Sequence, residues 1–361
     1  MDLSAPVNSA FTKALPKVEL HAHLSGSISR QCLHEIWKRK KAKNPQFPIE
    51  DPLVLMPPGK RLTLRHSFFQ VFSKLIYQLC NDLDSLAYAV TSVLEDFLAD
   101  GVRYLELRTI PRASPESNIT SEDYLTTVLD TIQTFKSGNQ EMSVFLILAL
   151  DRGNTTPIEA MRIIDLAITT KPRGVVGVDL CGNPTQGDVT LYRDAFARAK
   201  SHGLGLTLHF AETPASGSPA ELAALLSFQP DRLGHVIHVP DEFKREITRR
   251  RLGLELCLSC NVHAKLIQGS FLDHHFGEWR HEECPIALCT DDVGFFCSPV
   301  SNEYLLAAEH FELGRAELLK LCSGSVEVIF GGEQEKARLR GMLRDFSGKT
   351  TERGYARVTA T

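Results

Sequence analysis

The sequence predicts an α/β protein, a (β/α)8 TIM barrel with a helical insert after the first strand. Eight short runs are apolar and rich in β-branched residues, which is typical of buried strands. Most of the intervals between these runs have the periodicity of amphipathic helices. Strands and helices that alternate in this way indicate a parallel sheet with a helical cover, and eight units over about 270 residues fit a barrel better than an open sheet.

The predicted strands follow one another along most of the chain. Their ranges are 18–21, 102–108, 144–150, 174–180, 205–210, 232–236, 254–258 and 285–290. Helix-like periodicity occurs between them at 86–98, 124–135, 158–168, 191–200, 220–226 and 243–250. The first of these helices, for example, places Val90, Val93 and Phe97 on one apolar face.

The segment between the first two strands is too long for a simple crossover. It contains three helix-like stretches, at 30–41, 67–79 and 83–98. An insert after a barrel strand lies over the C-terminal mouth of the barrel, where it can act as a lid. We therefore predict one domain over 12–335, with 24–100 as a helical lid, and a disordered polar tail over 346–361.

Composition and charge exclude several classes of protein. Lys plus Arg number 40 and Asp plus Glu number 44, and the net charge of −4 argues against a nucleic-acid or anionic-membrane partner. No apolar run approaches the roughly 20 residues of a membrane helix, and the N-terminus lacks a secretory signal pattern. The nine cysteines are scattered, as expected for reduced core residues. We expect a cytoplasmic monomer with no nucleic-acid or membrane partner.

The strand ends carry side chains that bind metals and move protons. His21 and His23 close the first predicted strand and share one face, because alternate strand residues point the same way. Later strand ends supply the other candidates: His209 and Glu212 on the fifth, His235 on the sixth, and Asp291 and Asp292 on the eighth. Three histidines and one aspartate are a ligand set for a catalytic zinc, and the remaining residues suffice for proton transfer.

Each of these residues also has an ordinary structural interpretation. A single histidine such as His209 or His235 at a strand end is usually a satisfied polar residue, and Asp291-Asp292 is also a pattern for a helix N-cap. The functional interpretation depends on all of them reaching the same end of the barrel. Such convergence is improbable by chance.

Four motifs then resemble the adenosine deaminase family of zinc hydrolases, in its order and spacing, over about 15–331. They are LPKVELHAHL at 15–24, HFAE at 209–212, GH at 234–235 and TDD at 290–292. Four further segments are similar to the adenosine deaminase-like branch, whose members deaminate N6-methyl-AMP. They are HAHLSGSIS at 21–29, YLELRTIPR at 104–112, DLCGNP at 179–184 and LCLSCNV at 256–262.

The resemblance implies a role for each matching residue. One zinc ion per chain would be bound by four residues, His21, His23, His209 and Asp291. Glu212 would protonate the purine N1 while water attacks C6, and His235 would orient that water and help to take its proton. Asp292 would hold the water and contact N7, and Gly182 would lie against N3 through its backbone amide. The chain departs from the family at Val236, where glycine is usual, and at Cys260, where serine is usual.

The substrate expectation depends on Ser25. By the resemblance, adenosine deaminases have an aspartate at this position for the sugar 5′-hydroxyl, and adenine deaminases have a glutamate. Ser25 removes that negative charge and, with Ser27, offers hydroxyl donors to a phosphate. Arg152, or Lys60 and Arg61 in the insert, would supply positive charge. The resemblance therefore implies a small 5′-mononucleotide substrate, with N6-methyl-AMP converted to IMP and methylamine.

Three alternatives stay open: an adenosine or adenine deaminase, a non-catalytic purine-binding protein, and a two-metal barrel hydrolase. The last usually has a bridging lysine on a middle strand, which 177–180 lacks. Other signals are interpreted structurally. Cys257 and Cys260 are expected in the core, the basic run 38–43 at a solvated helix end, and His274, His275 and His281 at the surface or in loops.

Overall fold

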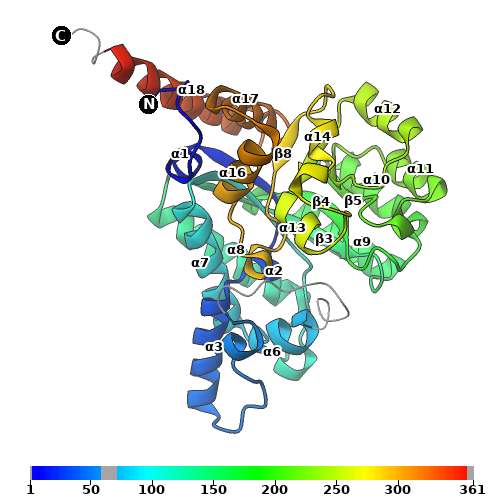
Figure 1. The fold of residues 1–361 in the computed structure, drawn as a ribbon. Helices are drawn as coiled ribbons and strands as arrows, with labels where there is room; N and C mark the ends of the chain where they lie inside the picture. Colours follow the sequence, from blue (N-terminus) through cyan, green and yellow to red (C-terminus); the bar gives the residue numbers. More distant parts are fainter. Residues whose placement is uncertain (1, 58–70, 356–361) are drawn as a thin grey trace.

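Eight parallel strands form the centre of the protein. This computed structural model describes residues 2–57 and 71–355. The strands pair in sequence order (Figure 1). They are β1 (Lys17–His23), β2 (Val102–Thr109), β3 (Ser143–Asp151), β4 (Val175–Cys181), β5 (Gly205–Phe210), β6 (Arg232–His235), β7 (Gly253–Leu256) and β8 (Ile286–Leu288).

The segment after β8 returns to β1 and closes the ring. The backbone N–H of Asp291 donates to the carbonyl of His21 (2.8 Å), and the N–H of His23 donates to the carbonyl of Asp291 (3.1 Å). The predicted TIM barrel is therefore confirmed. Closure also brings the end of β1 beside the segment that follows β8, although the two are far apart in the sequence.

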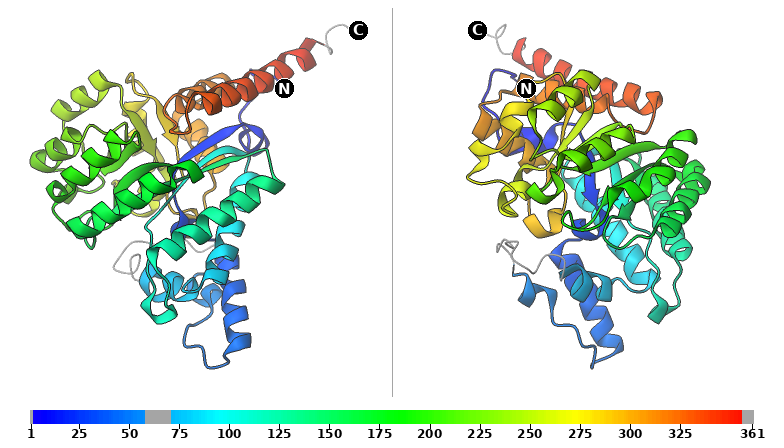
Figure 2. Two further views of the ribbon diagram at one scale, coloured as in Figure 1. Left: turned by 180° about the vertical axis from the view of Figure 1, so that it is seen from behind. Right: turned by 90° about the vertical axis from the view of Figure 1, so that its right-hand side faces the viewer.

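Helices cover the outside of the barrel (Figure 2). They are α7 (Leu83–Ala99), α8 (Ser121–Gly138), α9 (Pro157–Thr170), α10 (Arg193–Ser201), α11 (Pro219–Ser227), α12 (Asp241–Arg250), α16 (Val300–Phe311) and α17 (Arg315–Val326). Their starts follow ordinary capping rules. Thr120 with Asp123 and Thr156 with Glu159 form capping boxes on α8 and α9. No helix within the described residues is long and apolar enough to cross a membrane.

Short helices lie near the barrel mouth and carry several residues of the site. They are α2 (Leu24–Ser27), α4 (Pro52–Leu55), a π-helical turn (Phe72–Ile76), α6 (Tyr77–Leu79), α13 (Leu258–His263), α14 (Phe276–Trp279) and α15 (Val293–Phe296). The predicted insert helix at 30–41 is observed as α3 (Arg30–Lys43), next to α6 at the end of the molecule opposite α18 (Figure 1). Residues 58–70 lie outside the described residues, so only part of the predicted stretch 67–79 is described.

The C-terminal segment differs from the prediction of a disordered tail from residue 346. Instead α18 runs from Glu333 to Tyr355. Leu339 and Leu343 are buried on one side of this helix, and the Phe346 ring lies 5.8 Å from that of Phe11. Apolar residues at helical spacing therefore hold this helix against the rest of the protein. The polar composition of the residues after 346 did not indicate that the helix continues.

Candidate metal and catalytic site

Four side chains meet at the C-terminal mouth of the barrel. His21 and His23 come from β1, His209 from β5, and Asp291 from the segment after β8. One ligand atom from each lies within 4.8 Å of the others. His23 Nε2 is 3.2 Å from His209 Nε2, and Asp291 Oδ1 is 3.3 Å from His23 Nε2 and 3.5 Å from His21 Nε2. The structure thus brings together the four residues predicted as metal ligands.

The donor atoms fit a zinc ion. His21 Nε2 and Asp291 Oδ1 are buried without a hydrogen-bond partner, which is costly for polar atoms unless a cation binds them. Three imidazole nitrogens and one carboxylate oxygen are the kind of ligand that zinc prefers. Among the described residues, no group forms a hydrogen bond with either of these two atoms.

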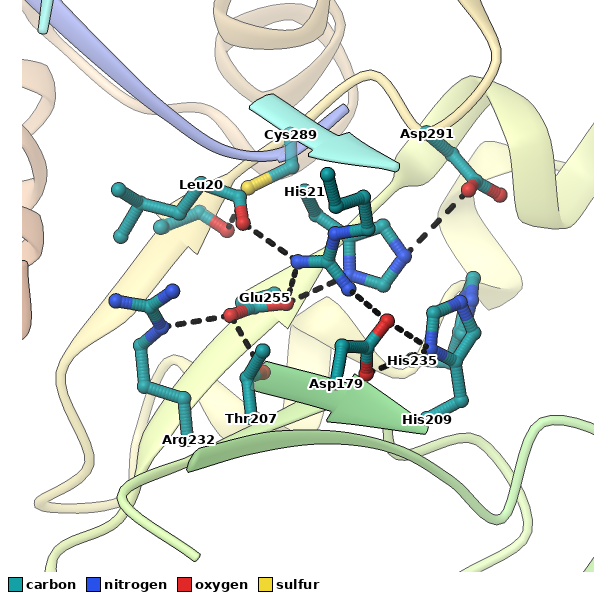
Figure 3. A network of polar contacts seen from close by, with 12 residues as sticks. Leu20, His21, Asp179, Thr207, His209, Arg232, His235, Glu255, Cys289 and Asp291 are labelled. Atoms are coloured by element: carbon teal, nitrogen blue, oxygen red, sulfur yellow. Dashed lines mark hydrogen bonds and ion pairs between the residues drawn. The ribbon is translucent and has the colours of Figure 1, made fainter. Parts of the chain in front are cut away.

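Two buried carboxylates hold the imidazole rings in position (Figure 3). Glu255 Oε2 accepts from His21 Nδ1 at 2.7 Å, and Asp179 accepts from His209 Nδ1 at 3.2 Å. With Nδ1 protonated, each ring directs the lone pair of its Nε2 into the cluster. These carboxylates were missed by the sequence reasoning. The available signal was an acidic residue inside an otherwise apolar strand run.

Arg108 joins these two carboxylates across the barrel interior. Its guanidinium donates to Asp179 at 3.0 Å, to Glu255 at 2.7 Å and to the carbonyl of Leu20 at 2.6 Å. Arg232 also donates to Glu255, at 2.7 Å. Although burial favours the neutral acid, the two guanidinium groups hold the pKa of Glu255 well below its usual range.

Glu212 lines the cavity two residues beyond the end of β5. Burial, followed by the nearby charge of Asp291, raises the pKa of Glu212 to about 8. The carboxyl is therefore protonated at neutral pH and able to donate. This is the property that the predicted N1 proton donor needs.

Asp292 is held close to α2. Its Oδ1 is buried without a hydrogen-bond partner, and a Cβ on Gly26 would lie 1.5 Å from that atom. Only glycine therefore fits at position 26. Burial and the neighbouring Asp291 and Glu212 raise the pKa of Asp292 well above its usual range.

The end of β6 has an unusual backbone. His235 and Val236 both have positive φ, 65° and 49°. This conformation suits the glycine that is usual at position 236 and costs a β-branched residue roughly 1–3 kcal/mol. His275 donates to the carbonyl of His235 at 2.6 Å, and the Trp279 indole donates to that of Val236 at 3.2 Å. These bonds hold the strained turn in place.

His274 and His275, expected at the surface or in loops, lie in the turn between residues 271–273 and α14, and His274 is buried there. His274 is 2% exposed, and His275 is partly buried. His274 Nε2 lies 3.0 Å from the side-chain amide of Asn261, which in turn lies 3.2 Å from His235 Nδ1. The short helices α13 and α14 bring these residues behind His235, and no periodic pattern in the sequence indicates that arrangement. His281 is exposed, as expected.

A cavity of about 1020 Å³ opens above these residues. Its floor includes His23, Glu212, His235, Asp291 and Asp292, and its wall includes Phe72, Tyr77 and Leu86 from the insert. Gly182 also lines it, with φ of +100°, and a Cβ there would lie 2.4 Å from Asp151 Oδ1. The insert thus covers the mouth of the barrel, and the cavity lies directly over the metal ligands.

The predicted phosphate contacts separate in the structure. Ser25 lines the cavity, whereas Ser27 is buried outside the lining. Arg152 is not suited to the role predicted for it. Its guanidinium forms two hydrogen bonds with Glu221 (2.8 and 2.9 Å) and one with the carbonyl of Gln186 (2.7 Å). Arg152 follows a strand that ends at the mouth, but its position in the sequence did not determine where its long side chain points.

Arg112 lines the described cavity together with Ser25. Arg108 also lines it but is held by the buried carboxylates Asp179 and Glu255. The Arg112 guanidinium lies 3.4 Å from the centre of the Tyr77 ring and donates to the Tyr77 hydroxyl at 2.5 Å. Tyr77 and Ser25 line the same cavity. Lys60 and Arg61, the other predicted cations, lie outside the described residues.

Cys260 is more than the core residue that was expected. It lines the cavity, and its thiol donates to Asp291 Oδ2 at 2.8 Å. Cys257 is fully buried, as predicted.

The fold and the four-residue cluster together define a metal-dependent hydrolase barrel. A family model described as adenosine deaminase matches residues 16–346. The chain belongs to the adenosine deaminase family, as its motifs predicted.

Similar proteins cover nearly the whole chain. The N6-methyl-AMP deaminase of Danio rerio is 37% identical over 91% of this chain and 94% of its own length. That of Homo sapiens is 34% identical over 93% and 94%. The crystal structure of the Arabidopsis N6-mAMP deaminase has a TM-score of 0.84 at 33% identity, covering 93% of this chain and 99% of that one. A structure described as an ADAL–IMP complex has a TM-score of 0.85 at 32% identity, over 95% and 100%.

Proposed function

We propose that this protein hydrolyses N6-methyl-AMP to IMP and methylamine. The observation that carries the proposal is the buried carboxyl of Glu212, whose pKa is raised to about 8, beside four potential metal ligands at the floor of a large cavity. Relatives at 34–37% identity are named N6-methyl-AMP deaminases, and a similar structure holds IMP, the expected product. A protein that only bound purines would not need this proton donor.

One zinc ion per chain would be held by His21, His23, His209 and Asp291. When bound, zinc supplies an activated water at neutral pH. The residues around it would carry out the remaining steps. Glu212 would donate its proton to N1, which makes C6 electrophilic, and Asp292 would hold the attacking water.

The reaction balances without a further reactant. The oxygen of water forms a bond to C6, and the bond between C6 and the methylamino nitrogen breaks. One proton of the water remains on the purine, and the other leaves with methylamine. Gly182 lines the cavity, and its backbone amide would lie against N3 of the purine ring.

Ser25 and Arg112 support a 5′-phosphate on the substrate. A carboxylate at position 25 would repel a phosphate at short range by about 4 kcal/mol per charge pair at an effective dielectric near 20. Ser25 avoids this repulsion, and Arg112 beside Tyr77 provides a cation on the same wall. A guanidinium is well suited to phosphate oxygens.

The cavity, of about 1020 Å³, has a size that suits a small-molecule substrate such as a mononucleotide. All nine cysteines are free, which supports a reducing compartment such as the cytoplasm.

The test is to compare kcat/KM of the zinc-loaded protein for N6-methyl-AMP, AMP, adenosine and adenine. We expect the methylated nucleotide to be preferred. A preference for adenosine or adenine would contradict the proposed substrate and leave the deaminase class intact. Binding of all four without turnover would instead indicate a non-catalytic purine-binding protein.

A further inference from the structure

His235 is held from behind by a chain of buried polar groups outside the metal cluster. Its Nδ1 lies 3.2 Å from Asn261 Oδ1, and Asn261 Nδ2 lies 3.0 Å from His274 Nε2. The backbone N–H of Phe276 donates to His274 Nδ1 at 3.0 Å. The three side chains are almost completely buried. An unbroken line of hydrogen bonds therefore connects α14 to the cavity.

The hydrogen bond from Phe276, at the end of this line farthest from the cavity, decides which atoms donate and which accept along it. A backbone N–H only donates, so His274 Nδ1 must accept from Phe276 and carries no hydrogen. The single hydrogen of the neutral ring then lies on Nε2. This N–H needs an acceptor, so the oxygen of the Asn261 amide must face His274. A half turn of the Asn261 amide, which exchanges its oxygen and its nitrogen, meets this requirement, because the hydrogen bonds decide the orientation of an amide.

The contact between Asn261 and His235 is then decided as well. With its oxygen committed to His274, Asn261 presents its NH₂ group to His235. Nδ1 of His235 must then accept, so the hydrogen of that ring lies on Nε2. We infer that His274 and Asn261 fix His235 as the Nε2–H tautomer, which meets the cavity as a hydrogen-bond donor.

This assignment changes the role expected for His235. An N–H at the cavity floor can hold the oxygen of the attacking water through a lone pair, but it cannot take the proton of that water. Glu212 lines the described cavity floor and, once it has given its own proton to N1, is a carboxylate that can accept the proton of the water. His274 touches none of the reacting atoms and is a positioning residue.

The geometry of His274 suits this role. Its ring stacks on His275 with centroids 4.1 Å apart and planes 25° apart. His275 donates to the carbonyl of His235 at 2.6 Å. One segment therefore holds both the backbone and the ring of His235.

The direct test is NMR of the protein labelled with nitrogen-15 in its histidines, which separates protonated from bare ring nitrogens. The His235 signals are those lost in the His235→Gln variant. We expect Nε2 to be protonated and Nδ1 to be bare at neutral pH, with and without zinc. A proton on Nδ1 in the wild-type spectrum would overturn the inference. This measurement needs no substrate, so it is independent of the proposed function.

Variants then test whether Asn261 and His274 set the tautomer. Asn261→Asp offers a carboxylate oxygen to both rings and should move the His235 proton to Nδ1. Its kcat for N6-methyl-AMP should fall roughly 10²–10⁴-fold, as when a catalytic histidine is held in the wrong tautomer, with KM and bound zinc little changed. His274→Gln should keep the wild-type tautomer and kcat, because its amide can accept from Phe276 and donate to Asn261.

His281→Gln is the matched control, because His281 is exposed in the segment that follows α14. It should leave both the spectrum and kcat unchanged. A wild-type tautomer or wild-type kcat in Asn261→Asp would overturn the inference. The kinetic arm rests on the proposed function, whereas the spectra do not. If the wild type fails to turn over N6-methyl-AMP, the substrate is wrong and the tautomer is still decided.

Discussion

At the scale of single residues, the fold gives chemically identical groups different roles. Asp291 is held ionised beside the ring nitrogens of the cluster, whereas Glu212, a short distance away, is pushed toward its neutral form by burial and by that same negative charge. Neighbouring carboxyl groups in one dry cavity cannot all be ionised, because their negative charges repel one another. One carboxylate can therefore bind a metal while its neighbour keeps a proton to donate.

Glu212→Gln tests this division of roles. The amide keeps the shape of the acid but has no proton to transfer, so kcat should fall by about 10²–10⁴-fold. Bound zinc and the circular dichroism spectrum should stay as in the wild type. Near-normal turnover by a zinc-loaded Gln variant would show that Glu212 is not the proton donor.

Ser25→Asp tests how the cavity distinguishes a nucleotide from a nucleoside. The new carboxylate would repel the 5′-phosphate, so kcat/KM for N6-methyl-AMP should fall more than about tenfold, while turnover of adenosine is spared or improved. Ser25→Ala is the control, because it removes the hydroxyl without adding charge and should cause a smaller loss. Equal losses for both variants would mean that repulsion is not the cause.

At the scale of elements, two helices near the site are joined by a buried acid. Glu303 on α16 accepts from the backbone N–H of Ser259 on α13 at 3.0 Å, and also from the hydroxyls of Ser259 and Ser298. Burial outweighs these donors and raises the pKa of Glu303 to about 7. The helix that carries Asn261 and Cys260 is thus fixed by a group that titrates near neutrality.

This junction makes a prediction about stability and pH. Because the folded pKa of Glu303 lies above the ordinary value of 4.5, its contribution is fully present below pH 4.5 and is lost as the pH rises through about 7. The loss is at most about 3 kcal/mol. In urea titrations, the stability difference between wild type and Glu303→Gln should therefore shrink from pH 5 to pH 7.5. A difference that does not vary with pH would contradict the assignment.

At the scale of the whole molecule, periodicity was enough to predict the barrel, and the resemblance to a known family then indicated which four strand-end residues are the ligands. Closure of eight parallel strands brings their C-terminal ends together, so residues such as His21 and Asp291 meet although they are 270 positions apart. The supporting residues could not be predicted in this way. Arg108 and Glu255 are charged residues inside buried strands, and their partnership depends on a register that no local pattern contains.

Long side chains and short irregular segments account for the other errors. Arg152 lies near the mouth, but its guanidinium turns to Glu221 on α11. His274 belongs to a segment of short helices with no periodic signal, so its burial was not visible in the sequence. Directions of side chains in such regions are decided by tertiary contacts, which a single sequence does not reveal.

The interior ion network gives the last prediction, because it couples the metal site to the stability of the barrel. Arg108 connects β2 to β4 and β7 through Asp179 and Glu255, the two carboxylates that orient His209 and His21. Arg108→Met would leave both buried acids short of a partner. Loss of such supporting contacts typically lowers metal affinity 10–100-fold, and breaking a buried ion pair costs about 3–5 kcal/mol.

Zinc affinity, measured by competition with a chelating dye, should therefore fall together with the melting temperature in Arg108→Met. Arg108→Lys keeps the charge but not the forked geometry, and should give an intermediate affinity if the Met variant does not fold. The control is Arg173→Met, which removes a partly exposed partner of Asp130 and should change stability by no more than about 0.5 kcal/mol. Unchanged zinc affinity in a folded Arg108 variant would mean that the ligands are oriented without the guanidinium that joins their carboxylates.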